Sequence, residues 1–278
     1  MLRKYENIII LMIKLIAFIP ILPAVFILGY VIIKGVPSIS WSFLTEMPRN
    51  GMREGGIFPA IIGTLYLTIG TIIVSVPLGV LTGIYLVEYS KDNGFKRIIN
   101  LTIINLAGIP SIVYGLFGMA LFVVAFGFGT SIISGVLTLG IMCLPVIITA
   151  TRESLLAIPN DLRQASLALG ATKWETVWRV VLPAAFPGII TGVILSISRA
   201  AGETAPILFT VAAFYLPFLP SSFFEQVMAL PYHLYVIATQ IPNMPEANMN
   251  GTVFVIVFIT VGFNLIGAFI RNKFRRIK

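Results

Sequence analysis

Charged residues are scarce in this chain of 278 residues: Asp, Glu, Lys and Arg together make up 11% of the sequence, whereas hydrophobic residues make up 58%. The mean hydropathy of +0.98 is far above that of soluble globular proteins. A chain with so little charge cannot surround a core with a solvated surface. We therefore predict a polytopic membrane protein.

Cysteine and histidine occur once each, as Cys143 and His233. This excludes a disulfide framework and a multi-ligand Cys/His metal site within the chain. We interpret Cys143 as a packing residue and His233 as a loop residue. The chain also lacks G-x-x-x-x-G-K-[ST], the loop that cradles nucleotide phosphates. We predict no catalytic residue and no cofactor here, so the energy for any pumping must come from elsewhere.

Six apolar tracts are long enough to cross a bilayer, which needs about 20 residues. They lie at 15–33, 57–87, 98–126, 132–156, 180–216 and 253–270. Gly and Pro interrupt the tracts, which membrane helices tolerate where neighbouring helices satisfy the freed backbone groups. We predict one all-α transmembrane domain, residues 1–278, with helix breaks at Pro110 and Pro206.

The distribution of Lys and Arg predicts which side each loop faces, because these residues mark the cytoplasmic side. The segments predicted to be cytoplasmic carry Arg3, Lys4, Lys91, Lys96, Arg97, Arg152, Arg163, Lys173, Arg179, Arg271, Lys273, Arg275, Arg276 and Lys278. The outer segments carry only Lys34, Arg49 and Arg53. Both termini are therefore expected to be cytoplasmic, and residues 217–250, without Lys or Arg, form an extracytoplasmic loop.

Residues 158–183, between the fourth and fifth tracts, have the pattern of a capped cytoplasmic helix. Asn160 is expected to cap a short helix, which Gly170 ends in the left-handed conformation. Thr172 and Glu175 have capping-box spacing for the next helix. The pattern alone leaves two interpretations open: a docking surface for another protein, or a loop helix that lies on the bilayer.

The fifth tract contains Arg199 and Glu203, although an arginine near the centre of a membrane helix costs about 2.5–3.5 kcal/mol. Glu203 lies one turn after Arg199 on the same helix face, and Ser196 extends this polar stripe one turn back. Pro206 is expected to kink the helix beside the pair, and Gly202 to admit a neighbouring helix, as parts of a gate.

Two interpretations of the charge pair remain. It is either an internal ion pair that makes the two charges tolerable or part of an anion site on a translocation path, where Arg199 binds the anion and Ser196 extends the polar stripe. In the anion site Glu203 holds Arg199, or the equivalent arginine of a second membrane subunit, when no anion is bound. A buried ion pair is at best neutral against apolar packing, so stability does not explain it. Guanidinium suits phosphate because it is always charged and offers paired donors. We favour the anion site.

The helical segment resembles the EAA motif of ABC importer permeases, E-A-A-x3-G-x9-I-x-L-P. The matching positions are Gln164, Ala165, Ser166, Gly170, Val180, Leu182 and Pro183. Gln164, Ser166 and Val180 depart from the motif residues. In that family the segment is the coupling helix that inserts into a groove of the ATP-binding subunit. The resemblance implies a coupling role for Asp161, Arg163, Gln164, Ala165, Ser166, Leu169 and Gly170.

Three further stretches resemble the A-type permease subunits of high-affinity phosphate importers: "EGGIFPAIIGTLYLT" from Glu54, "AGIPSIVYGLFG" from Ala107 and "RAAGETAP" from Arg199. The resemblance implies a type I importer permease fold (MetI-like) in a bacterial or archaeal inner membrane. It also implies a C-type permease partner, ATPase subunits that bind ATP-Mg and an extracytoplasmic phosphate-binding protein. A permease for sulfate, molybdate or phosphonate, and a self-contained secondary transporter or channel, remain alternatives.

Overall fold

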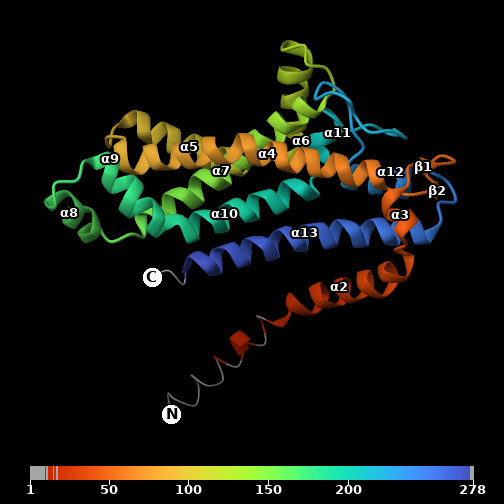
Figure 1. Cartoon of the computed structure of the whole chain (residues 1–278), viewed down its shortest axis with the longest axis horizontal. Coiled ribbons are helices and arrows are strands. Elements are labelled where there is room, and N and C mark those ends of the chain that lie inside the picture. The colour runs from red at the N-terminus through yellow and green to blue at the C-terminus, as the bar shows by residue number, and fades with distance from the viewer. Residues whose placement is uncertain (1–9, 11, 15, 17, 276–278) are drawn as a thin grey trace.

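The computed structural model describes residues 10, 12–14, 16 and 18–275, and almost all of its elements are helices. The predicted cytoplasmic residues Arg3, Lys4, Arg276 and Lys278 lie outside the described residues. Within the described part, five helices are long and apolar enough to cross a membrane, and one bent helix pair gives up to six spans. This confirms an all-α membrane protein with about six spans (Figure 1).

The crossing segments agree with most of the predicted tracts. They are α2 (Ile21–Gly35), α4 (Phe58–Ile84) with the π-helical segment η2 (Tyr85–Tyr89), α5 (Gly94–Ala107) with α6 (Ser111–Gly118) and the π-helical η3 (Met119–Ala125), α7 (Ile132–Leu156), α9 (Lys173–Thr176) with the π-helical η4 (Val177–Val181) and α10 (Leu182–Gly202), and α13 (Glu246–Arg275). Helix α7 coincides with its predicted tract. The third and fifth tracts are each divided into shorter helices.

Helices α4, α7, α10 and α13 run along the long axis of the molecule (Figure 1). Helix α7 is central, because α4, α5, α6 and α10 all pack against it. In the most apolar stretch of α7, 67% of the residues are buried, whereas in that of the first span, which contains α2, only 6% are buried. Helix α2 packs against α13 at the edge of the bundle, and the core therefore lies around α7.

Three of the four buried hydroxyl groups along α4 are satisfied within the helix, and only the Thr71 hydroxyl has no partner among the described residues. The hydroxyls of Thr64, Thr68 and Ser75 each donate to the backbone carbonyl four residues earlier, at 2.7–2.8 Å. These side chains are at most 3% exposed. Because small hydroxyl residues hide their polar atoms in this way, α4 can approach α7 closely without unpaired groups at these positions.

The third span is not one helix. Helices α5 and α6 are bent by 106° relative to each other, so the predicted tract 98–126 is a bent pair of helices. Pro110 immediately precedes α6 with an extended ψ of 141°, and its ring clashes with a preceding helical turn. The Tyr114 hydroxyl donates to the Leu106 carbonyl across the bend at 2.7 Å. The predicted break at Pro110 is therefore a sharp turn within the span.

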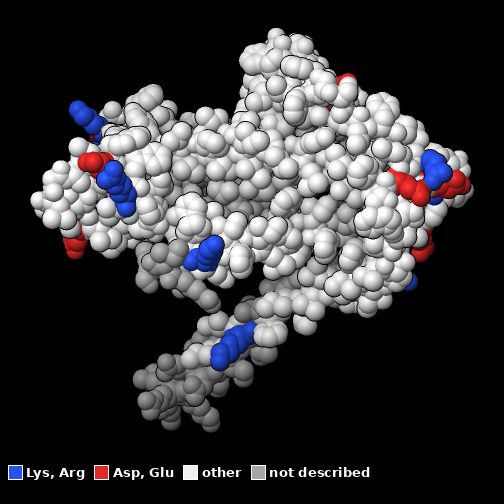
Figure 2. Space-filling view, in the orientation of Figure 1, with Lys and Arg blue, Asp and Glu red and all other residues white. Residues whose placement is uncertain are grey.

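The two ends of the bundle carry different elements (Figure 1). The α8 end carries α8 (Asn160–Ala168) and α9. The hairpin end carries η1 (Val36–Ser38), α3 (Trp41–Thr45), β1 (Pro48–Arg49), β2 (Glu54–Gly55) and α12 (Leu230–Thr239). Figure 2 shows that charged side chains on the visible face gather mainly toward the two ends, with an almost uncharged band between them. This distribution is typical of a membrane-crossing bundle.

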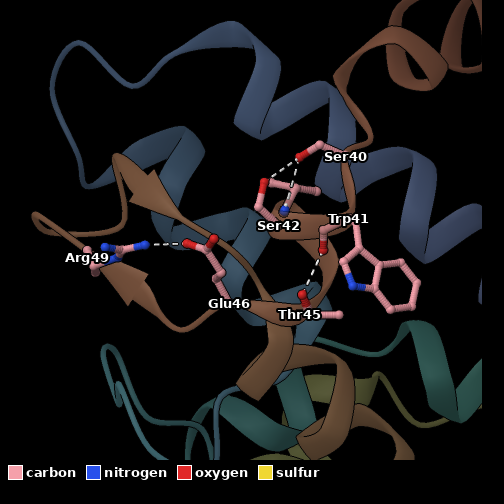
Figure 3. Close-up of polar contacts among 7 residues, drawn as sticks. Ser40, Trp41, Ser42, Thr45, Glu46 and Arg49 are labelled. Atoms are coloured by element: carbon pink, nitrogen blue, oxygen red, sulfur yellow. Dashed lines mark hydrogen bonds and ion pairs between the residues drawn. The ribbon is translucent and has the colours of Figure 1, made fainter.

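The segment after α2 is held by local polar contacts (Figure 3). The Ser40 hydroxyl caps α3 by accepting from the Phe43 amide at 3.1 Å, and the Thr45 hydroxyl donates to the Trp41 carbonyl at 2.8 Å. Arg49 forms an ion pair with Glu46 beside the antiparallel β1–β2 hairpin. Trp41 is 80% exposed, and tryptophan in such a position is typical of a membrane–water interface.

The predicted outer loop of residues 217–250 contains helix α12 and the start of α13. His233 lies in α12 and is only 3% exposed, so the interpretation as a loop residue is wrong. Its Nδ1 has no hydrogen-bond partner among the described residues, and burial lowers the pKa of His233 to about 4. Cys143 is 2% exposed in the core, which confirms its packing role.

Candidate functional site

Arg199 and Glu203 pair within this chain. Arg199 Nε donates to Glu203 Oε1 at 3.0 Å. The Arg199 side chain is 48% exposed and the Glu203 side chain 15%. The Arg199 side chain is thus about half exposed, while the Glu203 carboxylate holds the guanidinium through Nε. This arrangement leaves donors of Arg199 free for an external anion.

The helix ends at this pair. Helix α10 finishes at Gly202, Glu203 is extended (φ −76°, ψ 131°), and the short α11 (Ala205–Leu208) begins two residues later. The predicted tract 180–216 therefore holds two helices, α10 and α11, with the break close to Pro206. Pro206 has no N–H for the Gly202 carbonyl, so the expected kink is a complete break. Arg199 lies in the last turn of α10, where the helix dipole favours a cation.

Two other predicted members of the site do not join it. Ser196 is 1% exposed, and its hydroxyl donates to the Cys143 carbonyl of α7 at 3.4 Å. It therefore serves helix packing and does not extend the exposed polar stripe of Arg199. Gly202 is exposed, and no atom of the described residues lies within 4 Å of where its Cβ would be. The close approach predicted at Gly202 is absent within the described chain.

The two helix breaks lie on elements that touch each other, because α6, which follows Pro110, packs against α11. A small cavity beside the pair is lined by Glu203, Thr64, Thr68 and Ile207, among others. Its volume of about 10 Å³ is close to the space for a single water. The cavity is therefore too small for an oxyanion, and the accessible side of the pair is the exposed face of Arg199.

The predicted helix of the coupling segment is present as α8. Its start differs from the prediction, because Pro159 is the N-cap residue and Asn160 makes no side-chain cap. Its end agrees: Gly170 has φ +85°, the Gly170 amide donates to the Leu167 carbonyl at 3.0 Å, and the Ala171 amide donates to Ser166 at 3.3 Å. This is a Schellman motif. The capping box of Thr172 and Glu175 is also confirmed.

The predicted coupling residues fall on two faces of α8. Asp161, Gln164, Ala165 and Leu169 are exposed, and Leu169 is 90% exposed. Arg163 and Ser166 face the chain instead. The Ser166 and Thr176 hydroxyls share a hydrogen bond of 2.9 Å, which ties α8 to α9. The outward face is available to a partner, whereas the inward face fixes the helix to the bundle.

Glu88 of η2 is a residue that sequence reasoning missed. Arg163 Nη2 lies 2.8 Å from Glu88 Oε1, and the two side chains are 17% and 8% exposed. An acidic residue at the end of an apolar tract was the available signal. Only the fold shows that its partner is a residue 75 positions later.

No group of three or more His, Cys, Asp or Glu side chains in the described ranges is placed to hold a metal ion. The helix bundle and its broken spans define a polytopic membrane protein that exposes the capped helix α8 at one end.

Comparison with known proteins identifies the family. The model of the family described as "Binding-protein-dependent transport system inner membrane component" matches residues 75–276. The probable ABC transporter permease protein YqgI of Bacillus subtilis (strain 168) is 37% identical over 250 residues, which cover 85% of each chain. The phosphate transport system permease protein PstA of Mycobacterium leprae (strain TN) is 37% identical, covering 91% of this chain and 84% of that protein.

A solved structure supports the fold. The structure described as inward-facing conformations of the MetNI methionine ABC transporter superposes with a TM-score of 0.63 at 18% identity. The match covers 78% of this chain and 97% of that chain. The chain belongs to the family of inner membrane components of binding-protein-dependent transport systems. It is a multi-pass inner-membrane permease with the predicted MetI-like fold, and permeases of this class are not themselves catalytic.

Proposed function

We propose that this chain is the A-type transmembrane subunit of an ATP-driven phosphate importer, in which it forms half of the translocation path. The half-exposed side chain of Arg199 at a broken membrane helix carries the proposal. The similarity of this chain to a protein named as a phosphate transport system permease supports the choice of substrate. Sulfate, molybdate and phosphonate share the oxyanion chemistry and are the competing substrates.

Arg199 binds the anion and Glu203 competes with it. Guanidinium keeps its charge when desolvated and offers donors in a planar fork that fits phosphate oxygens. Glu203 would repel a phosphate dianion, so it is not a direct ligand. It holds Arg199 when no anion is present and is displaced when phosphate arrives. A single arginine gives modest affinity, which allows the permease to release its cargo.

The partners supply tight binding and energy. Separate ATPase subunits, which bind ATP-Mg, dock on the exposed face of α8, where Gln164, Ala165 and Leu169 lie. A C-type permease forms the other half of the path. An extracytoplasmic phosphate-binding protein docks on the segment of residues 217–250. Because this segment and α8 lie at opposite ends of the bundle, the α8 end is cytoplasmic in this proposal. ATP-driven closure of the ATPases moves α8 and reopens the path to the other side, by alternating access.

The test is uptake by the purified complex in proteoliposomes, with phosphate, sulfate, molybdate and phosphonate as candidate substrates. Arg199→Gln should abolish uptake while complex assembly and basal ATP hydrolysis remain. Glu203→Gln should lower the KM for phosphate, because the competitor of the anion is removed. Arg49→Gln is the matched control, since Arg49 also pairs with a nearby glutamate but lies in the β1–β2 hairpin.

Normal phosphate uptake by Arg199→Gln would refute the anion site. Uptake of another oxyanion in place of phosphate would refute the substrate. Uptake driven by an ion gradient without an ATPase subunit would instead indicate a secondary transporter or channel.

A further inference from the structure

Arg163 of α8 forms an ion pair with Glu88 at the end of the second span. Its Nε and Nη2 atoms donate to Glu88 Oε1 at 3.2 and 2.8 Å. Its Nη1 donates to the Ile158 carbonyl at 2.8 Å, and Nη2 also donates to the Leu155 carbonyl at 2.9 Å. One side chain thus joins three parts of the chain: α8, the end of α7 with the residues that follow it, and η2.

Because the ion pair of Arg163 and Glu88 is buried, it fixes the position of α8 relative to η2. The Glu88 side chain is 8% exposed, and an isolated carboxylate at such a site would be strongly disfavoured. Because Arg163 supplies the compensating charge, η2 and α8 cannot separate without leaving a buried charge unpaired. Apolar packing between η2 and α8 could slide, whereas this ion pair allows one register only.

A second contact connects the same two regions. Lys173 of α9 places its Nζ 5.1 Å from the ring centroid of Tyr89, the residue after Glu88. Ser166 joins α8 to α9 through the Thr176 hydroxyl. Helices α8 and α9 therefore both bind η2, α8 through Glu88 and α9 through Tyr89.

Helix α4 continues from η2 to the opposite end of the bundle. Near its start, the Thr64 hydroxyl accepts a hydrogen bond from the Leu230 amide at 2.8 Å. Leu230 opens α12 and is 1% exposed. One long helix thus has a fixed contact to the coupling segment at one end and to the hairpin end at the other.

We propose that Arg163 and Glu88 form a clamp that transmits the movement of α8 to α4, and through α4 to α12. The clamp makes the second span a direct receiver of the ATP-driven movement, in addition to the fifth span that follows α9 in the chain. Arg163 and Glu88 are positioning residues and touch neither anion nor ATP. This inference rests on the proposed function, because it needs an ATPase that moves α8.

The first test measures phosphate moved per ATP hydrolysed by the native complex in proteoliposomes. Glu88→Gln and Arg163→Gln should each lower this ratio at least about fivefold, the lower end of usual coupling between distant sites. The apolar double variant Glu88→Leu with Arg163→Met should assemble normally, because apolar replacement of a buried pair is often neutral for stability. Its transport ratio should nevertheless stay low.

Asp92→Asn is the matched control. Asp92 pairs with Lys96 near the same end of the bundle, but Asp92 is 94% exposed and the pair is local. The control should keep the wild-type ratio. A wild-type ratio in both single variants, or a restored ratio in the apolar double variant, would overturn the clamp and leave the proposed function standing.

A second test does not depend on the substrate. Spin labels at Ala168→Cys and Leu81→Cys report the distance between α8 and α4 in the complex, with and without ATP; the native Cys143 is buried. The clamp requires one narrow distance distribution in both states and a broadened one in Arg163→Gln. An unchanged distribution in Arg163→Gln would overturn the clamp. A wild-type complex that does not move phosphate would refute the proposed function, and the distance measurement would still decide the clamp.

Discussion

Replacing Gly63 by alanine should weaken the contact between α4 and the segment before α12. A Cβ at Gly63 would lie 1.9 Å from the Met228 carbonyl oxygen and 3.0 Å from Val227 Cβ. The nearest atom belongs to the backbone, so it cannot rotate away. To reach ordinary contact at 3.4 Å, the carbonyl must retreat by about 1.5 Å. That shift would also break the neighbouring bond from the Leu230 amide to Thr64.

The magnitude follows from these two effects. Overpacking a well-packed core costs about 1–3 kcal/mol, and a lost hydrogen bond about 0.5–1.5 kcal/mol. On the scale of a chain of about 150–250 residues, each kcal/mol lowers the Tm by about 2–4 °C. The expected fall for Gly63→Ala is roughly 5–15 °C, measured by thermal unfolding of the purified protein in detergent.

Gly29→Ala is the matched control, because Gly29 also lies inside a membrane helix but no described atom lies within 4 Å of its Cβ position. The Tm of this variant should stay close to that of the wild type. Equal Tm values for Gly63→Ala and Gly29→Ala would refute the reasoning, since the carbonyl contact is what distinguishes the two sites.

Two further predictions concern α12 and α8. The pKa of His233 is about 4 in the folded chain, against about 6.5 unfolded, so the unfolded chain binds more protons between these values. The contribution of neutral His233 to the free energy of unfolding is therefore complete above pH 6.5, and about 3 kcal/mol of it is lost as the pH falls to 4. The Tm of His233→Phe should fall less over this range than that of the wild type; parallel curves would contradict the prediction. Gly170→Ala places a side chain at φ +85°, which costs about 1 kcal/mol, and hydrogen exchange of the Ala171 amide should accelerate about fivefold. Gly94→Ala, at an open site with ordinary φ, should leave that exchange unchanged.

Local signals in the sequence predicted the coupling segment well. The capping box of Thr172 and Glu175 and the left-handed Gly170 depend on residues within one helical turn, and both are present. The capping role of Asn160 was wrong because Pro159 has the extended ψ of 138° that a cap position needs, and the helix begins one residue earlier. The start of the helix thus moves by one residue because Pro159, and not Asn160, occupies the N-cap position.

Hydropathy predicted the number of spans, and Pro110 and Pro206 indicated where two of them break, but neither signal predicted the geometry of the breaks. The tracts 98–126 and 180–216 are apolar throughout, so nothing in their polarity marks the 106° turn at Pro110 or the end of α10 at Gly202. Membrane helices often tolerate proline. The helices that follow the two breaks, α6 and α11, pack against each other, and only the folded chain contains that contact.

The candidate site was predicted in part. The i,i+4 spacing placed Arg199 and Glu203 on one helix face but left open whether Glu203 pairs with Arg199 or with the equivalent arginine of a second membrane subunit; in the structure the two residues of this chain pair. Ser196 lies about 60° around an ideal helix from Arg199, and it is buried against Cys143 because α7 covers that side of α10. Glu88 and Arg163 meet only through tertiary structure. Helix spacing thus finds pairs within one helix, and it does not show which side of the helix a neighbour covers.

The bend at Pro110 also constrains how the chain enters the membrane. Helix α5 has 14 residues, and α6 with η3 has 8 and 7, so neither arm reaches the roughly 20 residues that a helix needs to cross the bilayer alone. Neither arm can therefore remain stably inserted on its own during synthesis. Both arms pack against α7, which is made after them. The third span should thus be completed only when α7 has left the ribosome, and truncation before Ile132 should leave it incompletely integrated.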